Sequence, residues 1–133
     1  MSNSNAVNYS QEKTQTQPWS LVPLRNRLDA AALSEVSMEL GDLMAAGHHR
    51  LALDLKNNRF ICLQAIYYLV GLAEALAAIG GEFVLIACAE KTKRHFEIYG
   101  SLKHIRVVRS ESELSGEINR VSRSVPLDLQ ELP

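Results

Sequence analysis

The clearest pattern in the chain is a segment with helical spacing between two short apolar runs. The runs cover residues 51–55 and 83–88 and are almost continuously apolar, as strands buried on both faces of a sheet are. Residues 60–81 lie between them, and their apolar side chains recur at intervals of three and four. Gly80 and Gly81 provide a stop for a helix. The pattern predicts a strand–helix–strand unit with parallel strands and a right-handed crossover.

The helix of this unit is apolar on nearly every side. The stripe expected to face the sheet consists of Ile66, Leu69, Val70, Ala73, Leu76 and Ala77. The opposite side carries Leu63, Tyr67, Gly71, Leu72, Ala75 and Ile79. A helix of this kind is covered on more than one side, either by neighbouring helices, by a partner or second copy, or by lipid. Gln64, Glu74 and the flanking strands favour the interior of a soluble domain over a membrane span.

The residues before the central unit add one strand and one helix. Residues 19–24 predict a strand, and residues 25–27 predict a turn in which Asn26 tolerates a positive φ. Residues 30–46 predict a helix that Asp29 caps at its start. One face of this helix is expected to be apolar, and Gly47 is expected to end it; the face consists of Leu33, Val36, Leu40, Leu43 and Met44.

The residues after the central unit continue the alternation. Residues 89–99 predict a third helix that stops at Gly100, and residues 104–108 predict another strand. Residues 110–123 predict a last helix with Ser110 as its cap. The whole order predicts an α/β sandwich with a mostly parallel sheet of four or five strands and about four helices.

A chain of 133 residues has room for one domain with a real core. We expect a polar tail or weak edge strand over residues 1–17, the folded domain over residues 18–123, and a C-terminal tail over residues 124–133. The start of the chain has no apolar signal segment, and Cys62 and Cys88 form no close-spaced redox or metal pattern. These features predict a reduced, cytoplasmic protein.

The sequence contains few groups that could carry chemistry. Cys62 lies at the expected start of the central helix, where the helix dipole lowers a thiol pKa, so a structural and a reactive cysteine are the alternatives. His48 and His49 are adjacent and do not face one another on a helix. No phosphate loop, paired carboxylates or Ser-His-Asp set is present. We therefore expect no enzyme activity, no cofactor and no metal.

The charges give two further expectations. The net charge of −1 provides no general attraction to nucleic acid or anionic lipid. A locally basic region is a solvated face, a docking patch for an acidic partner or, last of the three, a contact for nucleic acid. It comprises Lys91, Lys93, Arg94, Lys103, Arg106 and Arg109.

Three stretches resemble the STAS domain, the fold of bacterial anti-sigma-factor antagonists. Residues 24–30 resemble the family's L-x-G-x-L-D opening, with Asn26 at the glycine position. Residues 51–55, followed by Phe60 and Ile61, resemble its central strand and the residues before its signature. Residues 80–85, then 93–96 and Gly100, resemble its next strand and helix. The resemblance spans roughly residues 18–120 and implies the STAS fold.

The family's D-S-S-G signature, at the start of the central helix, is absent. In that signature a partner kinase phosphorylates one serine, which switches off binding. The four positions here read Cys62, Leu63, Gln64 and Ala65, so Leu63 and Gln64 replace the phosphorylatable serines. A phosphate would add a charge of about −1.5 to −2 at an interface, and these side chains cannot accept it. The resemblance therefore implies a module that is not switched at this position.

The leading functional hypothesis is a non-enzymatic regulatory protein-interaction module. Its partner would be an anti-sigma or kinase-type regulator, or a second copy of the chain. The expected partner-binding residues are Asn57, Asn58, Arg59, Cys62, Leu63, Gln64 and Tyr67. Two alternatives stay open: a STAS-like structural subunit of a transporter ATPase complex or signalling scaffold, and a small ligand-binding or enzymatic domain that uses Cys62.

Overall fold

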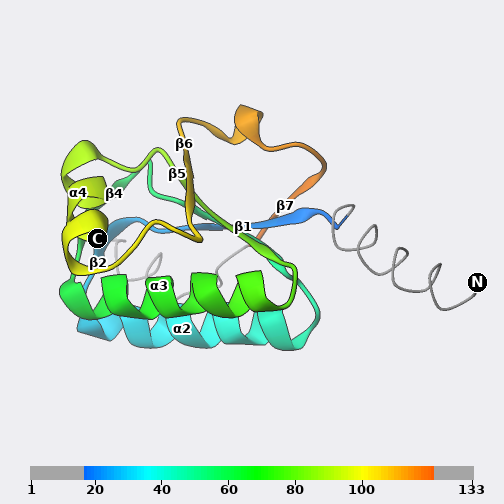
Figure 1. Ribbon diagram of the computed structural model, residues 1–133, viewed down its shortest axis with the longest axis horizontal. Coiled ribbons are helices and arrows are strands. Elements are labelled where there is room, and N and C mark those ends of the chain that lie inside the picture. The colour runs from blue at the N-terminus through cyan, green and yellow to red at the C-terminus, as the bar shows by residue number, and fades with distance from the viewer. Residues whose placement is uncertain (1–16, 122–133) are drawn as a thin grey trace, which may run out of the picture.

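Five parallel strands form the main sheet of the computed structural model, which describes residues 17–121 (Figure 1). The strand order across the sheet is β6-β5-β3-β1-β7, and each neighbouring pair is parallel. Strand β3 is therefore central, and β5 lies beside it, as their continuous apolar sequences predicted. The strands are β1 (Trp19–Pro23), β3 (Arg50–Asp54), β5 (Glu82–Ile86), β6 (Arg106–Val108) and β7 (Ile118–Arg120).

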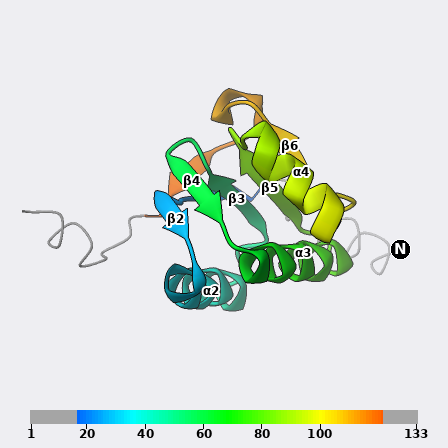
Figure 2. The ribbon, with the colours of Figure 1, turned by 90° about the vertical axis from the view of Figure 1, so that its left-hand side faces the viewer.

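Three α-helices accompany the sheet: α2 (Ala30–Ala45), α3 (Leu63–Ala78) and α4 (Glu90–Tyr99). Helices α2 and α3 lie side by side below the sheet, and α4 packs next to α3 (Figure 2). The Asp29 carboxylate accepts a hydrogen bond of 3.0 Å from the Ala32 N–H, which confirms the predicted cap of α2. Gly47, with φ +93°, ends that helix as predicted.

The core between the helices and the sheet confirms most of the predicted faces. Val36 and Leu40 of α2 are buried, and Ile66, Leu69, Ala73 and Leu76 of α3 point into the same core. Two assignments on α3 were wrong, because Leu72 is buried and Ala77 is exposed. Neighbouring helices thus cover two sides of α3, while part of its outer side stays exposed. No helix within residues 17–121 is long and apolar enough to cross a membrane.

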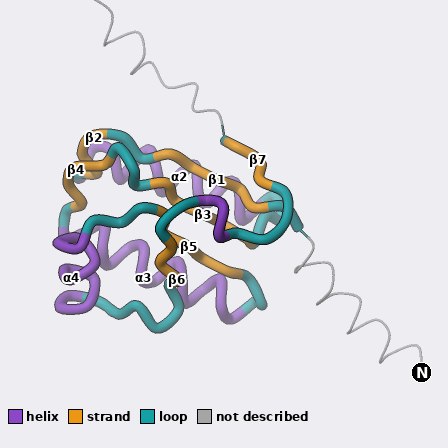
Figure 3. The backbone as a smooth tube through the Cα atoms, turned by 90° about the horizontal axis from the view of Figure 1, so that it is seen from above, coloured by secondary structure: helices purple, strands orange, loops and turns teal. Residues whose placement is uncertain are grey.

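The other face of the sheet is covered by the segment 109–117, which we call the strap. It carries the 3₁₀ turn η1 (Glu111–Glu113) and passes over the sheet from β6 at one edge to β7 at the other (Figure 3). Leu114 of the strap is buried in a second apolar cluster. The sheet residues of that cluster are Trp19, Leu21, Ala52, Val84, Ile86 and Val108.

The strap replaces the helix predicted for residues 110–123, which was wrong. Gly116 has φ +102°, a left-handed conformation that a helix interior does not contain. Ser110 makes no capping bond to the backbone, and the chain continues into β7. Residues 17–121 therefore contain three α-helices, where about four were expected. Residues 122 and 123 lie outside the described residues, as do the predicted edge strand and almost all of both predicted tails.

Two short strands that the sequence analysis missed form a second, two-stranded parallel sheet. We call β2 (Asn26–Leu28) and β4 (Asn58–Ile61) the ribbon. Residues 25–27 had been predicted as a turn, and residues 60–62 as part of the central helix, which instead begins at Leu63. Asn26 has φ +58°, which confirms the expected tolerance of a positive φ at this position.

Candidate interaction surface at the start of helix α3

The carboxyl ends of the parallel strands all lie at the same end of the sheet. The ribbon and the first turns of α2, α3 and α4 follow these ends directly. In open α/β sheets the carboxyl ends of the strands are the usual place for a binding site. All seven residues predicted to bind a partner lie here, because they all fall within residues 57–67, which run from the turn after β3 through β4 into the first two turns of α3.

The turn and β4 contribute three of the predicted residues. Asn57 is exposed, and its carbonyl accepts a hydrogen bond of 2.9 Å from the Asn26 N–H. Asn58 is half-buried, and its N–H donates to the Leu55 carbonyl at 3.0 Å. Its side-chain Nδ2 has no hydrogen-bond partner among the described residues. Arg59 is exposed on β4. The first bond joins β2 to the turn before β4, and the second closes that turn.

The start of α3 contributes the other four predicted residues. Cys62 is the half-buried N-cap residue, and its N–H donates to the Leu28 carbonyl at 2.9 Å. Leu63 and Gln64 occupy the first turn with exposed side chains, and Tyr67 lies one turn further on. The exposed fractions are 43% for Leu63 and 54% for Tyr67. Two large apolar side chains and one amide therefore face outward where the helix begins, and we call Leu63, Gln64 and Tyr67 the α3 surface.

The structure adds two residues that sequence reasoning did not assign to the site. Arg27 and Phe60 pair across the ribbon, and the Arg27 Cζ atom lies 4.3 Å from the centroid of the Phe60 ring. Phe60 is 38% exposed. Arg25, Lys56 and Arg59 are also exposed on or beside the ribbon. The site thus has a basic, partly aromatic flank next to the α3 surface. Only the pairing of β2 with β4 reveals it.

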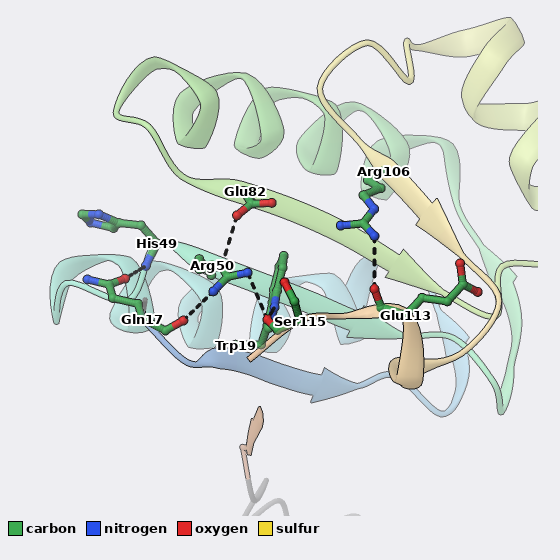
Figure 4. A network of polar contacts seen from close by, with 8 residues as sticks. All are labelled: Gln17, Trp19, His49, Arg50, Glu82, Arg106, Glu113 and Ser115. Atoms are coloured by element: carbon green, nitrogen blue, oxygen red, sulfur yellow. Dashed lines mark hydrogen bonds and ion pairs between the residues drawn. The ribbon is translucent and has the colours of Figure 1, made fainter. Parts of the chain in front are cut away.

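The basic region predicted around residues 91–109 does not form part of this surface as a unit. Lys91, Lys93 and Arg94 are on α4, whereas Arg106 is on β6, where its Nη2 donates to the Glu113 carbonyl at 3.2 Å (Figure 4). Arg109 begins the strap, and its N–H donates to a Glu113 carboxylate oxygen at 2.8 Å. The structure therefore distributes these cations over several elements.

The two cysteine thiols, Cys62 and Cys88, both lie near the carboxyl ends of the strands but have different neighbours. Burial and the nearby Glu90 carboxylate raise the pKa of Cys88 to about 11, although Lys93 opposes the shift. Cys62 lies between β4 and the first turn of α3.

The histidines His48, His49 and His104 precede β3 and β6, so they lie near the amino ends of the strands. Residues 17–121 contain no cluster of three or more His, Cys, Asp or Glu side chains that could hold a metal ion.

Comparisons with known proteins agree with this picture of the fold. The family model described as STAS domain matches residues 10–114. A structure titled "NMR Structure of the protein TM1081" has a TM-score of 0.61 at 16% identity, over 70% of this chain and 75% of that chain. The unphosphorylated anti-sigma factor antagonist SpoIIAA has a TM-score of 0.52 at 12% identity, over 84% of this chain and 89% of that chain. No curated protein matches the sequence.

Proposed function

Because the chain belongs to the STAS-domain family, we propose that it is a non-enzymatic, cytoplasmic regulatory module that binds another protein through the α3 surface and the adjoining turn. The partner is an anti-sigma or kinase-type regulator. SpoIIAA, whose fold this chain shares, is an anti-sigma factor antagonist. The proposal assigns the contact to Leu63, Gln64 and Tyr67, supported by Asn57, Asn58, Arg59 and Cys62.

The observation that carries the proposal is the outward exposure of Leu63 and Tyr67 beside the ribbon. Large apolar side chains with a polar rim are typical of the centre of a protein–protein interface, where aromatic residues contribute most of the binding energy. The first turn of α3 carries no acidic residue. It also carries Leu63 and Gln64 where the family places its phosphorylated serines. A contact of this kind is constitutive, because no added phosphate can repel the partner from these two positions.

The proposal is tested by capturing partners from the source cells with the intact chain and with two matched variants. Leu63→Asp places a charge in the middle of the α3 surface, and an acidic residue in the first turn of a helix is compatible with folding. Met38→Asp places the same charge on α2, where the Met38 side chain is 69% exposed. We expect the unmodified chain and Met38→Asp to retain the same partner, and Leu63→Asp to lose it.

Each outcome of the capture experiment is informative. Loss of a regulator only with Leu63→Asp supports the proposal, and the same loss with Tyr67→Asp extends it along the helix. Equal recovery of the partner by all variants would contradict the assignment of the surface. Recovery of a transporter ATPase, or only of further copies of this chain, would replace the regulatory proposal with that of a structural subunit.

A further inference from the structure

A hollow of about 310 Å³ lies between β2 of the ribbon and the first turns of α2. Buried Leu24, Leu28 and Val36 line it, together with Ala31 and Ala32 of the helix. The volume lies at the lower end of the range for small-molecule pockets. The remaining lining residues are polar or charged, so the hollow has an apolar floor, in which Ala31 is exposed and Ala32 half-exposed, within a polar rim. An apolar floor of this size suits one or two aliphatic side chains from a peptide segment.

The charges around the hollow are distributed unequally. Arg25 and Arg27 stand on the ribbon side and are exposed, and neither takes part in the ion pairs Arg50–Glu82 and Arg120–Glu111. Asp29 and Glu35 stand on the helix side, where the Asp29 carboxylate accepts from the Ala32 N–H. An apolar segment with acidic residues directed toward the ribbon would therefore complement both the lining and the ribbon side of the rim.

The described part of the chain ends beside Leu21 of β1, three residues before Leu24 in the lining of this hollow. Strand β7 runs parallel to β1, with Leu21 opposite Arg120, and the Val121 N–H donates to the Leu21 carbonyl at 2.9 Å. Val121 packs against the core on the helix side of the sheet. From this level of β1, Leu24 at the hollow is about 10 Å further along the chain. Six residues after Val121 can span up to about 20 Å, so residue 127 can reach the hollow.

The sequence beyond this exit has the matching composition. Residues 126–132 read Pro-Leu-Asp-Leu-Gln-Glu-Leu, with three leucines, two acidic residues and no basic residue. We propose that residues 126–132 dock in the hollow between β2 and α2 of their own chain. The leucines of the segment supply the apolar part of the contact, and its acidic residues supply the charge pairing with Arg25 and Arg27. This contact uses Arg25 and Arg27 of the basic flank but none of the α3 surface, and it does not depend on the function proposed for that surface.

The test compares amide resonances of the full-length chain and of full-length variants by NMR. Replacing Leu127 and Leu129 together by serine is expected to shift the amides of residues 24–36 and to leave the strap unchanged. Gln130→Ser, in the same segment, is the matched control and is expected to leave residues 24–36 unchanged. Asp128→Lys with Glu131→Lys is expected to produce the same shifts as the leucine variant.

Restoring the charge pairing provides an independent arm of the test. Adding Arg25→Glu and Arg27→Glu to the lysine variant is expected to return the amides of the first turns of α2, residues 30–36, toward their original positions. The proposal is overturned if neither tail variant shifts residues 24–36, or if Gln130→Ser shifts them as much as the leucine variant. It is also overturned if the shifts depend on protein concentration, because the occupant would then be the tail of a second copy.

Discussion

The guanidinium of Arg50 lies over the ring of Trp19, with Cζ 4.2 Å from the ring centroid (Figure 4). Arg50 is only 5% exposed, and its Nε is 3.1 Å from a Glu82 carboxylate oxygen. Its two terminal nitrogens donate to the carbonyls of Gln17 at 2.8 Å and Ser115 at 3.3 Å. The Trp19 Nε1–H also donates to the Ser115 carbonyl, at 3.0 Å. One arginine thus joins three strands to the strap.

Removing this guanidinium is expected to destabilise the fold. Arg50→Leu leaves the Gln17 and Ser115 carbonyls without these bonds and removes the cation over Trp19. We expect the free energy of unfolding to fall by about 2–3 kcal/mol. Urea unfolding followed by the fluorescence of Trp19, the single tryptophan of the chain, measures the change. Arg94→Leu, which removes an exposed arginine from α4, is the control and should cost well under about 1 kcal/mol. Equal losses would show that Arg50 does not hold the strap.

The backbone of Ala87 predicts a stabilising substitution. Ala87 follows β5 with φ +58°, and an alanine in the left-handed region costs about 1–2 kcal/mol relative to ordinary conformations. Ala87→Gly removes most of this cost, and after the entropy that glycine loses on folding we expect a gain of about 0.5–1 kcal/mol. Ala75→Gly, at an exposed position inside α3, should instead lose about 1 kcal/mol. Thermal unfolding of both variants measures the difference. A loss of stability in Ala87→Gly would contradict the strained backbone.

Replacing two glycines of one strand–helix–strand unit by alanine should change the stability of the fold in opposite directions. A Cβ at Gly81 would collide with the His49 carbonyl oxygen, so Gly81→Ala must displace β5 from β3. Gly71 lies within α3 with open space around it, so Gly71→Ala should stabilise the helix by about 0.5–1 kcal/mol. The two unfolding midpoints, measured in urea, should move in opposite directions. Similar shifts for both would contradict the close approach at Gly81.

The raised pKa of Cys88 predicts a loss of stability in alkali. Its thiol has a pKa of about 11 in the fold, against an ordinary value of 9.0, because burial and Glu90 disfavour the thiolate. Between these values the unfolded chain releases a proton that the folded chain keeps, so the free energy of unfolding decreases as pH rises from 9.0 to about 11. Cys88→Ala should flatten this part of the pH profile. An unchanged profile in Cys88→Ala would contradict the assignment.

The central unit could be predicted because each of its parts has a strong local signal. Strands β3 and β5 are buried on both faces and are therefore continuously apolar. Helix α3 has the spacing of one buried stripe, and Asp29 is a favourable cap for α2. The seven site residues were predicted together because they lie within residues 57–67, around the family's signature position at Cys62–Ala65.

The ribbon and the strap could not be predicted from such signals. Strands of three and four residues are too short to display a period, and Arg27 meets Phe60 only through pairing across the chain. In residues 110–123 the spacing of Leu114, Ile118 and Val121 imitates a helix. In the fold Ile118 and Val121 belong to cores on opposite sides of the sheet, as strand residues three apart do.

The most direct test of the proposed function is the affinity of the captured partner for the purified full-length chain. Isothermal titration should give a dissociation constant that is at least about tenfold weaker for Leu63→Asp, a change of about 1.4 kcal/mol. Met38→Asp should bind within about twofold of the unmodified chain, since a rim or remote charge contributes little. Equal affinities for the unmodified chain and Leu63→Asp would contradict a partner site at the start of α3.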